Sequence, residues 1–158
     1  MKPDVLQAHL DHFVEEMAML LETEGLPRMY GRVFGYLLIS EPRHQSSAQL
    51  AEALHASRGA ISTATRALVK ASLIKPKRIP GSRATYFEVP DDAFDQLWHG
   101  AVARISVFRK VVDSGLELVA EQTDRDPRRL EGFRDAYRFM EAEFPKLLER
   151  WDAQKEES

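Results

Sequence analysis

Basic and hydroxyl side chains recur at helical spacing between Ser57 and Lys70. Arg58, Ser62 and Arg66 follow one another at intervals of four residues, so a helix would place them on one face. A guanidinium group can donate two hydrogen bonds to the edge of a guanine, and hydroxyl groups suit phosphate oxygens. This face is therefore chemically suited to contact nucleic acid.

A second basic group follows in a predicted β-hairpin. Residues 73–79 and 84–89 have the composition of strands, and Pro80-Gly81-Ser82-Arg83 between them is typical of a turn. A single arginine at the tip, Arg83, can enter a narrow minor groove, where the negative potential is strongest. Ser47, near the start of the helix before this one, is added as a further candidate. The candidate DNA contacts are therefore Ser47, Ser57, Arg58, Gly59, Ser62, Thr63, Arg66, Lys70, Lys77, Arg78 and Arg83.

Charge is unevenly distributed along the chain. Its 158 residues carry a net charge of −3, which by itself argues against a protein that coats nucleic acid. From Arg43 to Phe87, however, there are eight lysines and arginines and one acid, Glu52, so this segment has a charge of +7 and the rest −10. Such a basic segment is the expected footprint of a nucleic-acid site, the alternative being a solvated surface with chance clustering.

Local signals predict the elements that carry these side chains. Apolar periodicity and chain breakers predict a helix over about 27–40, apolar nearly all round and therefore a core helix. Region 45–72 is expected to form two short helices, the first capped by Ser46 or Ser47 and the second by Ser57. On the second of these, the inward face is formed by Ile61, Thr65 and Leu68.

The predicted elements follow the order of a winged helix-turn-helix: helix, helix, turn, helix and hairpin. The positive charge lies on the last three of them. In this fold the second helix of the pair enters the major groove. We therefore predict a mainly α protein with a small β-hairpin. Residues 25–90 form the DNA-binding domain, and residues 1–24 and 91–158 form a helical dimerisation region. Two other functions stay open: a protein-interaction adaptor with weak DNA affinity, and an RNA-binding winged helix.

The terminal segments carry apolar stripes that favour a homodimer. Over about 4–24 the apolar residues follow the a/d spacing of a helix that packs along a seam. After Pro90 we expect one long helix, a break near 123–127 and a last helix, which Pro145 should kink or split near Glu143. One small winged domain cannot cover all of these stripes, and a two-fold dimer would match a palindromic operator. Alternatively, the stripes pack on each other within one chain.

Two motifs resemble a known family. They are Ser47-x-x-Leu50-Ala51 and Ser57-Arg58-Gly59-Ala60-Ile61-Ser62-x-x-x-Arg66-x-Leu68, preceded by Glu24-Gly25-Leu26-Pro27-Arg28-Met29-x-Gly31-Arg32-x-x-Gly35-x-Leu37-Leu38. This pattern is similar to the GbsR-type branch of the MarR-like transcriptional regulators. The resemblance implies a homodimeric winged-helix repressor or regulator, often of transport or osmoprotectant genes. Ala60 and Thr65 depart from it, since relatives often carry a polar residue at the first position and a larger apolar one at the second.

The C-terminal region suggests a place for a small-molecule effector. Aromatic residues there could line a cleft against the winged domain and form a cage for a quaternary ammonium group, although aromatic residues at helical spacing are also typical of a plain core. The candidates are Trp98, Phe108, Tyr137 and Phe139. His9, His12 and Glu16 share a helix face, but we expect the histidines to flank the seam, and no metal or cofactor is predicted.

Several classes of protein are excluded by what the sequence lacks. Without cysteine there is no disulfide scaffold, catalytic thiol or thiol-based sensing of oxidants. No glycine-rich phosphate loop, G-x-S-x-G or H-E-x-x-H motif indicates an enzyme. Because neither a signal core nor a membrane-spanning run is present, we expect a cytoplasmic protein. The sequence thus predicts a dimeric, sequence-specific transcriptional regulator, with double-stranded DNA and its own second copy as partners.

Overall fold

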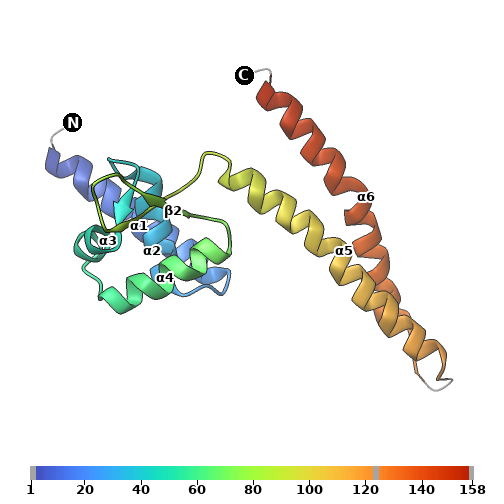
Figure 1. Cartoon of the computed structure of the whole chain (residues 1–158). Coiled ribbons are helices and arrows are strands. Elements are labelled where there is room, and N and C mark those ends of the chain that lie inside the picture. The colour runs from blue at the N-terminus through green and yellow to red at the C-terminus, as the bar shows by residue number, and fades with distance from the viewer. Residues whose placement is uncertain (1–2, 123–124, 157–158) are drawn as a thin grey trace. The chain divides into compact units, whose positions relative to one another are not determined.

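A computed structural model describes residues 3–122 and 125–156. By internal contacts the chain divides into two units, one reaching to Phe94 and the other starting at Asp95. The helices are α1 (Pro3–Thr23), α2 (Arg28–Ile39), α3 (Ser47–Ala53), α4 (Arg58–Lys70), α5 (Ala93–Ala120) and α6 (Arg128–Glu156), and the strands are β1 (Gln45–Ser46), β2 (Lys75–Arg78) and β3 (Thr85–Glu88) (Figure 1).

The first helix packs closely on α2. A Cβ added to Gly31 of α2 would lie 2.5 Å from the Cα atom of Ala18, so only glycine permits this approach. Polar contacts support the pair, because the Glu15 carboxylate accepts hydrogen bonds from Arg28 and Arg32, each at 2.7 Å. As expected of a core helix, α2 is buried on two opposite sides, at Gly31 and Gly35 and at Val33 and Leu37. Leu38, by contrast, is 44% exposed.

The helix-turn-helix is fixed by its caps. Ser46, rather than Ser47, caps α3: its hydroxyl accepts from the backbone of Gln49, whose side chain in turn accepts from the Ser46 backbone. Ser57 caps α4 as expected, its Oγ lying 3.1 Å from the backbone nitrogen of Ala60. Between the helices His55 has a φ of 48°, which turns the chain.

Three antiparallel strands form a small sheet in the order β1-β3-β2. The hairpin register pairs Lys77 with Tyr86, and its turn contains Gly81 with a φ of 83°. Strand β1, which the sequence did not predict, pairs Gln45 with Phe87 and so adds a third strand to the hairpin. The predicted fold is confirmed: mainly helical, with a winged helix-turn-helix and helices before and after it.

The second unit is a hairpin of α5 and α6, drawn in yellow and red in Figure 1. Pro145 does not split α6, which runs unbroken over 29 residues. Contacts with α5 on both sides of the proline hold α6 together: Phe144 packs on Trp98, and Trp151 donates a hydrogen bond to Asp95 at 2.9 Å. Across the described residues, no helix offers an apolar stretch that would cross a bilayer.

Candidate nucleic-acid interface

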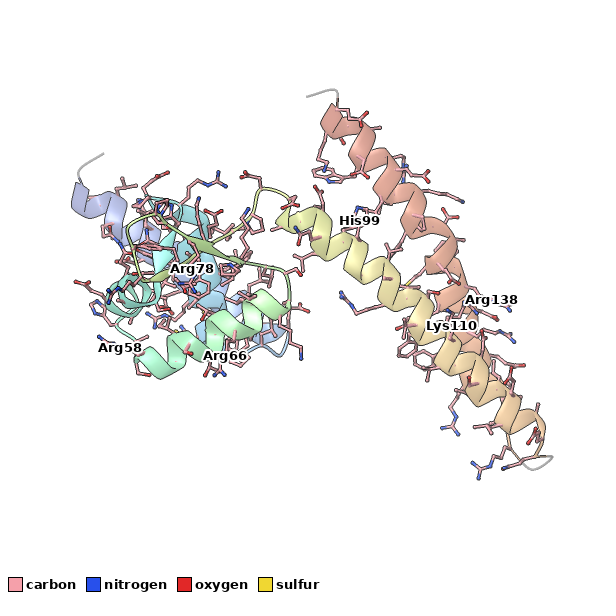
Figure 2. All side chains as sticks on the ribbon, viewed as in Figure 1. Arg58, Arg66, Arg78, His99, Lys110 and Arg138 are labelled. Atoms are coloured by element: carbon pink, nitrogen blue, oxygen red, sulfur yellow. The ribbon has the colours of Figure 1, made fainter. Side chains whose placement is uncertain are left out.

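Helix α4 has one buried face and one exposed face. The buried face consists of Ile61, Ala64, Thr65 and Leu68, and it packs against the rest of the first unit. The opposite face is solvent-exposed and carries Arg58, Ser62, Thr63, Arg66 and Lys70. Figure 2 shows Arg58 and Arg66 on this helix. With Gly59, which is also exposed, the structure thus brings together the six candidates of α4, because the 3.6-residue period separates them from the core.

The basic helix face is arranged for a partner outside the chain. Within the described residues, no carboxylate lies within 4 Å of Arg58, Arg66 or Lys70. Arg66 donates from Nε to the backbone oxygen of Ser62 at 3.2 Å, which directs the side chain along the exposed face. An arginine held in this way keeps its terminal nitrogens for a base edge or a phosphate.

At the start of α4 the backbone is accessible. Gly59 is exposed, and a Cβ added there would meet only the Ser57 hydroxyl, 3.9 Å away. Amide groups at a helix N-terminus also favour an anion such as a phosphate. Ser57 itself is committed to its cap, and Ser47 is half-buried at the first turn of α3. These two serines are therefore less available for DNA than the exposed residues of α4.

Thr65 has a structural role in α4. Its side chain is 2% exposed, and its hydroxyl donates to the backbone oxygen of Ile61 at 2.9 Å. The buried hydroxyl therefore does not remain without a partner, which would be costly. Its departure from the larger apolar residue of relatives leaves the packing of this face intact.

In the hairpin the candidate cations fall into two groups. Arg78 ends β2 and is labelled in Figure 2, and Arg83 lies between the turn and β3. Both are exposed, with no carboxylate within 4 Å in the described part of the chain. Lys77, by contrast, donates to Glu88 at 2.7 Å. That hydrogen bond, with a second contribution from Lys75, holds the pKa of Glu88 below its usual range.

The sequence did not predict that two acids just after the basic segment would pair with its cations. Glu88 pairs with Lys75 and Lys77, and Asp91 pairs with Arg43, so three of the eight cations between residues 43 and 87 have an acidic partner. The cross-strand pairing of Lys75 with Glu88 is the signal that would have found the first set. The Arg43–Asp91 pair joins residues 48 positions apart, which periodicity cannot reveal.

The four effector candidates do not converge on one hollow. Phe108 and Tyr137 stack at a centroid distance of 4.1 Å, so each ring covers a face that a quaternary ammonium group would need. They line an open, mainly apolar hollow of about 350 Å³, which Trp98 and Phe139 do not line. Phe139 is 67% exposed. Effector binding stays a prediction, and this hollow is one place in the second unit where a ligand could bind.

The polar residues of α1 do not form a metal site. His12 lies 3.4 Å from the Glu16 carboxylate, and His9 is exposed. In the described residues no group of three or more histidine and acidic side chains is arranged to hold a metal ion.

Comparison with known proteins identifies the family. The chain is 34% identical to the HTH-type transcriptional regulator MmpR5 of Mycobacterium tuberculosis over 140 residues, which covers 89% of this chain and 82% of that protein. Residues 92–154 match the family described as "MmpR5-like MarR family transcriptional regulator". This chain belongs to the MarR family. The similarity is thus to MmpR5-like regulators, and the narrower GbsR-type branch is not supported.

A solved structure supports the fold of this MarR-family protein. The crystal structure of a transcriptional regulator is 33% identical, has a TM-score of 0.82, and is matched over 92% of this chain and 99% of its own. The protein is therefore a DNA-binding transcriptional regulator and not an enzyme. In this family context, the exposed face of α4 and the hairpin, or wing, are the candidate surface for DNA.

Proposed function

We propose that the protein is a homodimeric repressor that reads a palindromic operator, with α4 in the major groove and the wing on the flanking backbone or minor groove. The observation that carries the proposal is the exposed face of α4, where Arg58 and Arg66 have no acidic partner among the described residues. Bases are read by such bidentate donors, and the phosphates by the remaining cations and hydroxyl groups.

The dimer is supported by the second unit. Large apolar side chains remain uncovered there, since Val107, Val111 and Leu118 of α5 are 62, 67 and 66% exposed. Their spacing of four and seven residues places them within roughly 40° of one another around the helix axis. A second copy would cover this stripe through a two-fold interface, and two copies of α4 would then reach half-sites about one helical turn apart.

To act as a repressor, the dimer needs only to bind DNA. A dimer bound across a promoter occupies the DNA that a polymerase must contact, so binding by itself lowers transcription. In a reconstituted transcription assay, we expect the protein to lower transcript yield only from templates that carry its operator. An increase in transcript yield would show activation instead.

Selection of bound fragments from random duplex DNA tests the operator. We expect an enriched palindrome with two half-sites spaced by about one helical turn, and a dimer by sedimentation at the binding concentration. Titrations at several salt concentrations separate this function from that of an adaptor. A steep fall of affinity with salt supports phosphate contacts, whereas weak and salt-insensitive binding supports the adaptor. Competition with duplex RNA tests the remaining alternative.

A further inference from the structure

Acidic and basic side chains meet at the base of the wing. We call this cluster the wing base; it consists of Arg43, Lys75, Lys77, Glu88 and Asp91, which together line one hollow of about 380 Å³. Its three cations and two acids leave a charge of +1, where the cations alone would give +3. The acids therefore cancel most of the positive charge that these three cations bring to the wing base.

Glu88 is the centre of the wing base. Its side chain is only 14% exposed, and its two carboxylate oxygens lie 3.5 Å from Nζ of Lys75 and 2.7 Å from Nζ of Lys77. The sheet register explains this arrangement. Lys75 is directly opposite Glu88, and Lys77 is two residues further along the same strand and so on the same face. One carboxylate thus engages both lysines of β2.

The other end of the hairpin is different. Arg78 and Arg83 are exposed, and neither has a carboxylate within 4 Å in the described residues. Arg78 follows Lys77 in β2, so the strand alternation directs it to the opposite face from Glu88. The tip of the wing therefore presents unneutralised charge, whereas its base does not.

We propose that Glu88 limits the affinity of the wing for DNA by engaging the ammonium groups of Lys75 and Lys77 that would otherwise neutralise phosphates. This inference rests on the proposed binding of DNA through the wing. A phosphate approaching the wing base must compete with a carboxylate that is already in place. Glu88 thereby lowers affinity for every duplex alike, and sequence discrimination is left to α4.

The test is the neutral variant Glu88→Gln, measured by fluorescence anisotropy on a selected operator and on a random duplex. Removing one negative charge should steepen the salt dependence by about 0.9 in log K against log salt, the value for one added phosphate contact. That change in slope corresponds to roughly 8-fold tighter binding than wild type at 0.1 M salt for both duplexes. Adding Lys77→Ala to Glu88→Gln should return the slope to its wild-type value.

Matched variants separate this effect from a general change of charge or of fold. Glu52→Gln removes the one acid between residues 43 and 87, which has no ion-pair partner among the described residues, and should leave the salt slope unchanged. Glu88→Asp keeps the charge and should retain the wild-type slope. Glu88→Thr removes the charge with a residue that suits a strand, and it replaces Glu88→Gln if thermal unfolding shows that the latter does not fold.

Three outcomes would overturn the inference: unchanged or weaker binding by folded Glu88→Gln and Glu88→Thr, a slope change of equal size in Glu52→Gln, or tighter binding to only one of the two duplexes. The first would mean that Glu88 positions the lysines for phosphates. Wild-type protein that binds DNA without salt dependence would instead contradict the proposed function itself, along with this inference.

Discussion

The two units of this protein differ in how far they enclose their apolar side chains. In the first, helices α1–α4 and the sheet enclose a core that includes Val33, Leu50, Ile61 and Leu68, each at most 1% exposed. In the second, two helices of 28 and 29 residues touch mainly through long side chains, such as the Arg109–Glu141 pair at 2.5 Å. A hairpin of two helices has too few neighbours to enclose its own apolar residues.

This difference suggests a division of roles between DNA reading by α4 and assembly of the dimer. The first unit can hold the exposed face of α4 rigidly, because a closed core fixes the helix from behind. The second unit leaves Val107, Val111 and Leu118 exposed, and of the first unit it is α1, outside the reading face, that exposes Leu6 and Leu20. Exposed apolar stripes of this kind are typical of an interface. Variants in each unit should therefore fail in different ways.

The largest expected effect is on the core of the first unit. Leu68→Ala should lower the free energy of unfolding by about 2–5 kcal/mol, since Leu68 is 1% exposed and its loss leaves a cavity behind α4. Chemical denaturation at several protein concentrations measures it. If the core is closed within one chain, this loss of unfolding free energy should not depend on protein concentration. A loss that changes with concentration would contradict the contrast between the two units.

Next in size is the apolar stripe of α5. The double variant Val111→Glu, Leu118→Glu should yield monomers by sedimentation and weaken operator binding by roughly 100-fold or more, since two linked half-sites are no longer engaged together. Leu38→Glu is the matched control, because Leu38 is also exposed, at 44%, but lies in the first unit. Monomers from the control, or dimers from the double variant, would place the interface elsewhere.

A smaller effect is expected on the reading face itself. Arg66→Ala should weaken operator binding by about 1–3 kcal/mol and relax one base position. Arg138→Ala removes the same charge from an exposed site in the second unit and should leave base preference unchanged. Equal losses on operator and random duplexes for Arg66→Ala would show a phosphate contact rather than base reading.

The smallest expected effect is at the cap of α4. Ser57→Ala removes the acceptor for the Ala60 amide and should cost about 1 kcal/mol of stability. Because the frayed turn carries Arg58, operator affinity should fall slightly as well. Thermal unfolding measures the first effect, and Ser57→Asp, which restores an acceptor, should recover it.

Local patterns were sufficient for most of the first unit. The cap at Ser57 and the inward face with Ile61 and Leu68 were predicted, because both depend on residues close in sequence. Strand β1 was missed, since its two residues show no periodicity. Of the kink or split expected at Pro145, the split was wrong: α6 is continuous, and it contacts α5 on both sides of the proline.

The sequence by itself determined the helices of the first unit, the cap of α4 at Ser57 and the exposed cations of α4, because each follows from spacing along one element. Tertiary structure alone decided which cations remain unpaired. Glu88 meets Lys77 across a hairpin, and Asp91 meets Arg43 from 48 residues away. Ion pairs depend on distances of a few ångströms between side chains, and the order of residues does not contain those distances until the chain has folded.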